Sequence, residues 1–218
     1  MLQDEHCKIT LREMKRSMEV DARAGKLMID GKYQFLIPDL YAACQYWFEG
    51  IETPDGLISG NEVWTRLYPN AEKLDVLRSP HLYKEHAVRP NTYQSKPLIK
   101  KWFNTNGIYT STHDLISKII MFDVDGDKSL VVADSTLIKV AERECSDVVP
   151  LYYPMAKAGA VQITPLSLYD GMVAAWTGGN IGEISNQITK IWNSDYPDKD
   201  AVKILCMLNN FTIDQLVA

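Results

Sequence analysis

Apolar and polar positions recur with different periods along the chain, and the first 40 residues already show two of them. Residues 3–24 are charged and lack Gly and Pro, and Met14 and Met18 belong to a thin apolar stripe at helical spacing. In residues 26–39, two apolar runs flank Asp30-Gly31, a pair typical of a two-residue hairpin turn. The pattern predicts a solvated helix followed by a β-hairpin.

The middle of the chain carries short apolar runs separated by Gly, Pro, Asn and Asp. Such runs are typical of short strands. Residues 40–49 fit either a helix or a buried strand, and residues 79–107, which hold three prolines, are predicted to be irregular or edge-like. Strands are predicted at residues 62–68, 74–78, 115–122 and 129–133.

The last third of the sequence follows a helical period. Ser135 is the expected N-cap of a helix that begins there. Ile181, Ile184 and Ile188 recur at helical spacing further along. Two more helices are expected at residues 201–208 and 212–217.

Composition narrows the class of protein. The chain has 218 residues, 46% of them hydrophobic, which is enough for a substantial core. With 23 basic and 28 acidic residues, it shows no broad basic surface, which argues against a self-sufficient nucleic-acid binder. Its four cysteines form no CxxC pair, and we expect reduced thiols in a cytoplasmic protein. No signal peptide or membrane span is expected.

The chemistry of the sequence is concentrated in residues 119–134, which read IIMFDVDGDKSLVVAD. Asp123, Asp125 and Asp127 occupy alternating positions, with Gly126 between the last two. Close exposed carboxylates repel each other by about 1 kcal/mol per pair, and this repulsion must be offset by a cation or by full solvation. The cluster therefore needs an explanation beyond that of an ordinary turn.

Four interpretations of this acidic turn are open. It can be a plain hairpin turn at Asp125-Gly126, or a calcium loop, although Lys128 stands where such a loop has its sharp-turn glycine. It also resembles the nucleophile loop of haloacid-dehalogenase-type phosphatases, in which Asp123 attacks phosphorus and Asp125 acts as acid and base. Finally, a short turn that directs three carboxylates toward one point can supply the hard oxygen ligands that bind Mg²⁺.

The fourth interpretation has further support, because DVDGD resembles the Asp-x-Asp-Gly-Asp signature of the two-barrel RNA polymerases. Residues 74–83, LDVLRSPHLY, resemble the Arg-x-Pro-x-Leu-His segment upstream of that signature, with Arg78, Pro80 and Leu82 matching and Tyr83 replacing the final His. The segment GKLMIDGKYQFLIPD resembles the first hairpin of the same barrel. The whole run is most similar to the single-chain polymerases of phages and prophages.

The resemblance implies an α+β fold with a double-psi β-barrel core and flanking helices. It divides the chain into an N-terminal helix (1–24), a barrel with the Asp-triad loop (25–144) and a helical C-terminal segment (145–218). Asp123, Asp125 and Asp127 are implied as catalytic ligands of Mg²⁺, for which Mn²⁺ can substitute. Arg78 contacts the incoming nucleotide by the same resemblance, and Lys128 is a candidate for phosphate.

The implied function is nucleotidyl transfer in transcription, with nucleoside triphosphates as substrates and DNA or RNA as template. Polymerases of this family use two barrels, whereas 218 residues hold one, so we expect a second polymerase barrel as partner and no activity of this chain alone. Two alternatives stay open. One is a phosphatase that uses Asp123 as nucleophile, and the other is a non-catalytic barrel remnant that binds nucleic acid.

Overall fold

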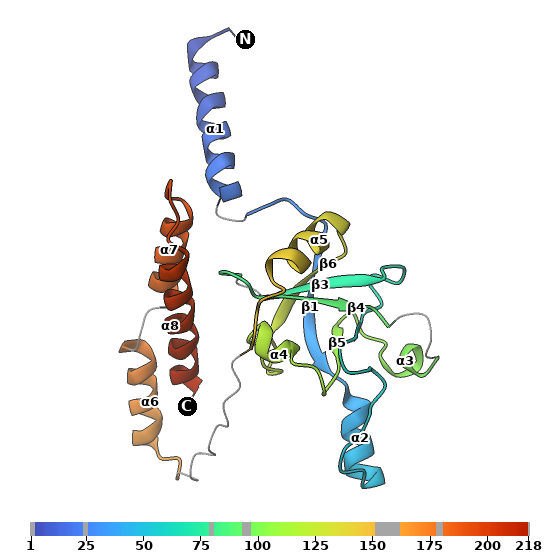
Figure 1. Ribbon diagram of the computed structural model, residues 1–218. Coiled ribbons are helices and arrows are strands. Elements are labelled where there is room, and N and C mark those ends of the chain that lie inside the picture. The colour runs from blue at the N-terminus through green and yellow to red at the C-terminus, as the bar shows by residue number, and fades with distance from the viewer. Residues whose placement is uncertain are drawn as a thin grey trace. The chain divides into compact units, whose positions relative to one another are not determined.

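The chain was analysed in a computed structural model (Figure 1). The structure describes residues 3–23, 26–78, 81–92, 97–150, 162–177 and 181–217. It divides into two compact units. One unit consists of Ile29–Pro154 and the other of Met1–Met28 together with Met155–Ala218. The domain boundaries expected from the sequence stay predictions.

Six strands of the first unit form one sheet in the order β2-β5-β1-β6-β3-β4. The two ends of this sheet meet, because Val63 of β2 forms a bridge with Asn91, and the Thr92 backbone N–H donates to the Val63 carbonyl at 3.0 Å. The sheet is thus a nearly closed barrel. The strands are β1 (Gly31–Pro38), β2 (Val63–Trp64), β3 (Lys73–Arg78), β4 (His86–Pro90), β5 (Ile108–Thr110) and β6 (Lys128–Val132).

The pairing of the strands is mixed. β1 runs parallel to β5, with Leu36 opposite Ile108, and the other adjacent pairs are antiparallel. β1 and β3 are joined through β6, which lies between them and pairs with both. The expected fold class, α+β with a double-psi β-barrel core and flanking helices, is confirmed.

Side chains at alternate positions along the strands point into the barrel and fill it. Leu74 and Val76 of β3, and Val131 of β6, are completely buried inside it. A second apolar cluster lies against β2 and β5, where the Phe103 and Tyr109 rings stack with centroids 4.4 Å apart. The barrel core consists of Leu36, Val63, Leu74, Val76, Ala87, Ile108, Ile116, Ile120 and Val131.

Four short helices belong to the same unit: α2 (Leu40–Glu49), α3 (Pro97–Trp102), α4 (Ile116–Ile119) and α5 (Ser135–Glu144). α5 lies against β3 and β4. α2 begins where β1 ends, and its N-cap Asp39 accepts hydrogen bonds from the Tyr41 and Ala42 backbone N–H groups. It ends at Gly50, whose φ of 69° is the left-handed conformation that favours glycine.

The other unit is helical, with α1 (Glu5–Arg23), α6 (Pro165–Thr177), α7 (Ile181–Trp192) and α8 (Lys199–Val217). α7 and α8 pack against each other and bury Ile188 and Val202. The helix expected at residues 3–24 and the helical spacing from Ile181 are both confirmed. The two helices expected at 201–208 and 212–217 are one continuous helix.

Three other sequence expectations are wrong. Asp30-Gly31 does not connect two strands, since residues 26–30 are not a strand and β1 starts at Gly31. Residues 115–122 contain the short helix α4 rather than a strand, so that Ile116 and Ile120 reach the barrel core from one helical face. The N-cap of α5 is Asp134, not Ser135, because the Asp134 carboxylate accepts from the N–H groups two and three residues on.

Two segments had more than one predicted structure. Residues 40–49 are the helix α2, and residues 79–107 contain β4 and α3. Within the part of the chain that the structure describes, no helix has the length and apolar character that crossing a membrane requires.

Candidate metal centre

The acidic turn connects α4 to β6. The chain leaves α4 through Met121, which has a φ of 50°, an uncommon value for a residue other than glycine. Gly126, with a φ of 132°, lets the backbone reverse direction before β6. Residues 123–127 therefore form a tight projection at the entrance to β6, and the barrel holds both of its ends.

Backbone contacts fix the turn while its carboxylates face solvent. The Asp127 carboxylate accepts from the Asp123 N–H at 3.3 Å, and the Asp123 carboxylate accepts from the Asp125 N–H at 3.3 Å. The Leu36 N–H of β1 donates to the Asp127 carbonyl at 3.0 Å, which ties the turn to the barrel. Asp123, Asp125 and Asp127 all lie at the surface.

The three carboxylates converge. One oxygen from each of Asp123, Asp125 and Asp127 lies within 4.8 Å of the other two, and among the described residues no other group of three His, Cys, Asp or Glu side chains does this. The pKa of the Asp125 carboxyl is raised above its ordinary value, first by its hydrogen bond with Asp123 and next by the negative charge of Asp123. Three hard oxygen donors that repel each other are a ligand set that fits Mg²⁺.

Arg78 lies beside this turn. It is the last residue of β3, and its Cα is paired with that of Ser129, two residues after Asp127. Arg78 follows Leu74 and Val76 on the inward-facing row of β3, and Ser129 opposite it is completely buried. The register therefore sets Arg78 at the end of the barrel where the acidic turn enters.

Lys128 stands on the other row. It is the first residue of β6, directly after the turn, and its Cα is paired with that of Phe35. Its ammonium nitrogen lies 4.6 Å from the centroid of the exposed Phe35 ring. The structure thus brings the three aspartates together, aligns Arg78 with the same end of the barrel, and places Lys128 at the outer edge of the turn.

Other parts of the polymerase-like motif are placed less completely. Pro80 lies outside the described residues. His81 and His86 are not helical, and their rings meet edge to face with their centroids 4.6 Å apart. His86 Nδ1 lies 2.7 Å from the carboxylate of Asp75, which is almost fully buried on β3. Sequence reasoning missed this pair, although an acid inside the apolar run LDVL was a signal for it.

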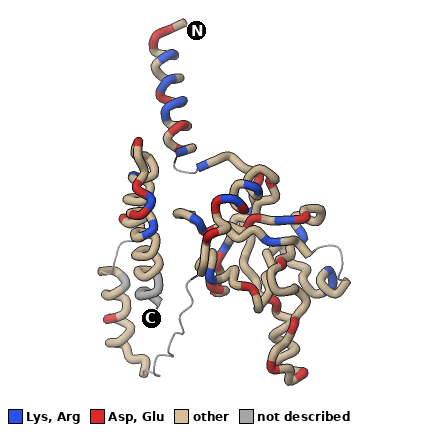
Figure 2. The backbone as a smooth tube through the Cα atoms, in the orientation of Figure 1, with Lys and Arg blue, Asp and Glu red and all other residues tan. Residues whose placement is uncertain are grey.

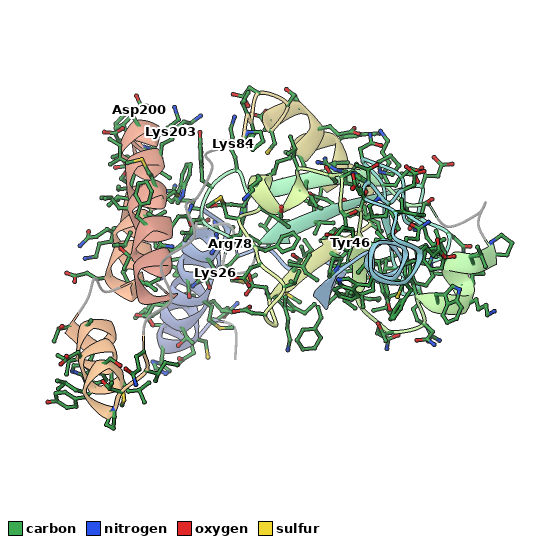
Figure 3. All side chains as sticks on the ribbon, turned by 90° about the horizontal axis from the view of Figure 1, so that it is seen from below. Lys26, Tyr46, Arg78, Lys84, Asp200 and Lys203 are labelled. Carbon is green, nitrogen blue, oxygen red and sulfur yellow. The ribbon has the colours of Figure 1, made fainter. Side chains whose placement is uncertain are left out.

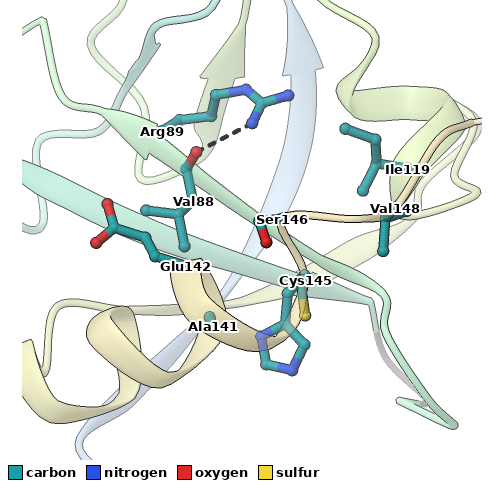
Figure 4. A pocket seen from close by; sticks show the side chains of 9 residues that line it. Val88, Arg89, Ile119, Ala141, Glu142, Cys145, Ser146 and Val148 are labelled. Atoms are coloured by element: carbon teal, nitrogen blue, oxygen red, sulfur yellow. Dashed lines mark hydrogen bonds between the residues drawn. The ribbon is translucent and has the colours of Figure 1, made fainter.

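A hollow lies near the Asp75–His86 pair. It has a volume of about 280 Å³ and is lined by residues of β4, α4 and α5 and of the segment after α5. Figure 4 shows Cys145 and Val148 at its wall, and the Arg89 guanidinium turned back toward the Val88 carbonyl, to which it donates at 3.0 Å. Burial raises the pKa of the Cys145 thiol above its ordinary value. No aspartate of the acidic turn lines this hollow.

A six-stranded barrel that carries an Asp-x-Asp-Gly-Asp turn is the arrangement that the resemblance to the double-psi β-barrel RNA polymerases implies, and the sequence of this chain is similar over nearly its whole length to part of a phage RNA polymerase. Over 215 residues it is 49% identical to the DNA-directed RNA polymerase YonO of Bacillus phage SPbeta. The match covers 98% of this chain and 25% of YonO, so the chain spans about a quarter of the length of this curated relative.

Two other comparisons complete the picture. No protein-family model matches the sequence. Among solved structures, the RNA-dependent RNA polymerase QDE-1 from Thielavia terrestris is similar, with a TM-score of 0.44 and 14% identity, covering 85% of this chain and 22% of that chain.

Proposed function

We propose that the chain is the catalytic barrel of a Mg²⁺-dependent RNA polymerase, and that it catalyses nucleotidyl transfer from nucleoside triphosphates when joined to a second barrel. The observation that carries this proposal is the convergence of Asp123, Asp125 and Asp127 on one turn of a barrel whose sequence is 49% identical to part of a phage RNA polymerase. Because YonO is a DNA-directed polymerase, DNA is the favoured template. The proposed place of action is the cytoplasm.

Each residue has a defined part in this proposal. The carboxylates of Asp123, Asp125 and Asp127 hold Mg²⁺, which when bound lowers the pKa of a primer hydroxyl and neutralises charge on the leaving phosphates. The hydrogen bond from Leu36 to Asp127 keeps the turn in register with the barrel. Arg78, on the inward row next to the turn, is proposed to orient the sugar of the incoming nucleotide. Lys128 exchanges its contact with Phe35 for a phosphate.

A second barrel is part of the proposal for two reasons. Polymerases of this family use two barrels, and the matched segment is a quarter of YonO. In addition, the acidic turn supplies only negative charge, whereas triphosphates need cationic partners beyond one arginine and one lysine. We therefore expect the isolated chain to bind Mg²⁺ and to synthesise no RNA.

The geometry lends the phosphatase alternative no support. In a doubly wound phosphatase the nucleophile follows a parallel strand at the carboxyl edge of an open sheet. Here Asp123 follows the helix α4, and the strand after it, β6, is antiparallel to both of its neighbours. The barrel-remnant alternative predicts no RNA synthesis, so an assay of RNA synthesis distinguishes it from the polymerase.

A chimera provides the direct test. The quarter of YonO that matches this chain is replaced by the chain itself, and incorporation of radiolabelled nucleotides is measured on a DNA template with Mg²⁺. The proposal predicts RNA synthesis by the chimera and loss of synthesis, by about a thousandfold or more, in Asp125→Asn. A folded chimera that synthesises no RNA, beside an active YonO, contradicts the proposal.

Metal binding is tested separately on the chain alone. Mn²⁺ is titrated in and its free concentration is followed by electron paramagnetic resonance. Asp125→Asn is expected to weaken binding at least about tenfold, because a neutral amide replaces one of three anionic ligands. Asp30→Asn, which removes an exposed carboxylate outside the acidic turn, is the matched control and should bind as the unaltered chain does. Equal affinity in all three proteins excludes the acidic turn as a metal site.

A further inference from the structure

The helix α2 presents apolar side chains to solvent along one of its faces. Leu40 is 54% exposed, Trp47 69% and Phe48 82%. With the exposed Cys44 and with Ile51, which is 38% exposed just beyond the helix, they recur at intervals of three and four residues. We call these five residues the α2 aromatic surface.

On the opposite face of α2, the first part of the helix packs on the barrel unit, whereas Tyr46 further along is 55% exposed. Ala42 is buried, and the Gln45 side-chain oxygen accepts from the Gly56 N–H at 2.9 Å. The helix is also fixed at its start, where the buried Asp39 carboxylate accepts from the Leu57 and Ile58 N–H groups at 2.5 and 2.9 Å. The α2 aromatic surface is therefore a rigid platform, because its helix cannot roll over to bury these side chains in the barrel unit.

The charge pattern around this platform indicates what kind of partner it fits. α2 contains no Lys or Arg, and its one charged residue is Glu49. The segment that follows adds Glu52 and Asp55, both exposed, and Figure 2 shows this end of the unit with acidic residues and no basic ones. A nucleic-acid backbone is repelled by such a surface. Aromatic residues without lysine are instead typical of the core of a protein–protein interface.

The α2 aromatic surface is separate from the acidic turn. Tyr46 of α2 and Arg78, at the end of β3 beside the turn, lie well apart in Figure 3. α2 starts at the end of β1 that the turn contacts through Leu36, but none of the five residues of the α2 aromatic surface belongs to the turn.

The exposed apolar area is of the size that an interface core needs. Aromatic side chains carry about 150–250 Å² each, so the exposed parts of Trp47, Phe48, Leu40 and Ile51 add up to roughly 500 Å². Stable interfaces bury about 800 Å² on each partner, with an apolar centre and a polar rim. Here Glu49, Glu52 and Asp55 supply an acidic rim.

We propose that the α2 aromatic surface docks onto the polymerase portion that lies outside this chain, the portion that corresponds to the other three quarters of YonO. This inference rests on the proposed function, because it takes the chain to be one part of a larger polymerase. The docking site on that portion is an apolar groove that receives Trp47 and Phe48. Basic residues at its edge face Glu49 and Glu52.

The exposed thiol of Cys44 provides a probe that does not depend on activity. Cys44 is alkylated with a maleimide, and the rate is read by peptide mass spectrometry in the isolated chain and in the YonO chimera described above. Docking predicts labelling at least about tenfold slower in the chimera, since a docked surface is exposed only by local opening. The double variant Trp47→Ser, Phe48→Ser should restore rapid labelling in the chimera.

The two substitutions leave the folded chain intact, because both side chains are largely exposed in the isolated chain. The isolated chain should have the same free energy of unfolding with and without the two serine substitutions, and this is measured first. Equal labelling rates in the chain and the chimera overturn the docking proposal. Protection that depends on the concentration of the isolated chain, or that single-stranded DNA induces, assigns the surface to a second copy or to nucleic acid and also overturns it.

The two proposals fail in distinguishable ways. A chimera in which Cys44 is protected but no RNA is made leaves the docking intact and contradicts the polymerase function. A chimera that makes RNA while Cys44 is labelled at the rate of the isolated chain supports the function and overturns the docking.

Discussion

The buried carboxylate of Asp39 accepts four hydrogen bonds from backbone N–H groups. Only 1% of the residue is exposed. One of its oxygens accepts from the Tyr41 and Ala42 N–H groups at the start of α2, and the other accepts from the Leu57 and Ile58 N–H groups of the distant turn. Asp39→Ala therefore removes a helix cap and leaves two further buried donors without an acceptor.

The expected cost follows from these two parts. Loss of an N-cap costs about 0.5–2 kcal/mol. Each buried donor left without its partner costs about 1–3 kcal/mol, and Leu57 and Ile58 are both buried. We expect Asp39→Ala to lower the free energy of unfolding by about 3–6 kcal/mol. Asp39→Asn should lower it less, because an amide oxygen still accepts from two of the four donors.

The chain contains a matched control at the start of α5. Asp134 also caps a helix through two N–H groups, each at 2.9 Å, but it is exposed and the structure shows no link to a distant turn for its carboxylate. Asp134→Ala should cost about 0.5–2 kcal/mol. Unfolding in urea is followed by circular dichroism for both variants. Costs that agree to within about 0.5 kcal/mol refute the claim that Asp39 holds two segments together.

Three further predictions follow from other contacts of the barrel unit. Arg89 binds the Asp114 carboxylate through two bonds of 2.6 and 2.9 Å, and the Asp114 side chain is 5% exposed, so Arg89→Ala should cost about 3–5 kcal/mol in urea unfolding and Arg89→Lys less. Gly56→Ala should destabilise by about 1–3 kcal/mol in the same assay, because Gly56 has a φ of 70° and a Cβ there meets the Asp39 carboxylate. Burial first, and His86 next, lower the pKa of His81 below 6.5, although Glu85 and Asp75 oppose this. The unfolded chain thus takes up this proton first as the pH falls, stability declines below about pH 6.5, and His81→Gln should flatten that decline between pH 7.5 and 5.5; an unchanged decline contradicts the assignment.

The sequence predicts the fold class well, and the reason is the resemblance rather than the periodicity. The reading of short apolar runs between turn residues as strands identified β3 and β6. It failed at residues 115–122, where a run of apolar residues is compatible with either structure and only burial of Ile116 and Ile120 against the barrel selects a helix. It also failed at Asp30-Gly31, a strong turn signal that precedes β1 without a partner strand.

The candidate site, like the fold, could be predicted from the sequence only in part. The spacing of Asp123, Asp125 and Asp127 could be recognised directly, because all three lie within one turn. Their relation to Arg78 could not be worked out from spacing, since 45 residues separate the two segments and only the pairing of β3 with β6 brings them together. The buried Asp75–His86 pair and the exposure of α2 depend on which face each element turns to its neighbours, and one sequence does not contain that information.

The acidic turn shows why a barrel suits this kind of site. The negative charges of its carboxylates repel each other, so the turn is held by the backbone N–H groups that these carboxylates accept from and by the strands at its two ends. β6 continues directly from it, β1 binds the Asp127 carbonyl, and β3 places Arg78 opposite Ser129. Three strands thus fix one short segment, and the stability of the barrel core maintains the convergence of the aspartates against their repulsion. A cation that binds them relieves this repulsion, so metal binding and the stability of the barrel are expected to be linked.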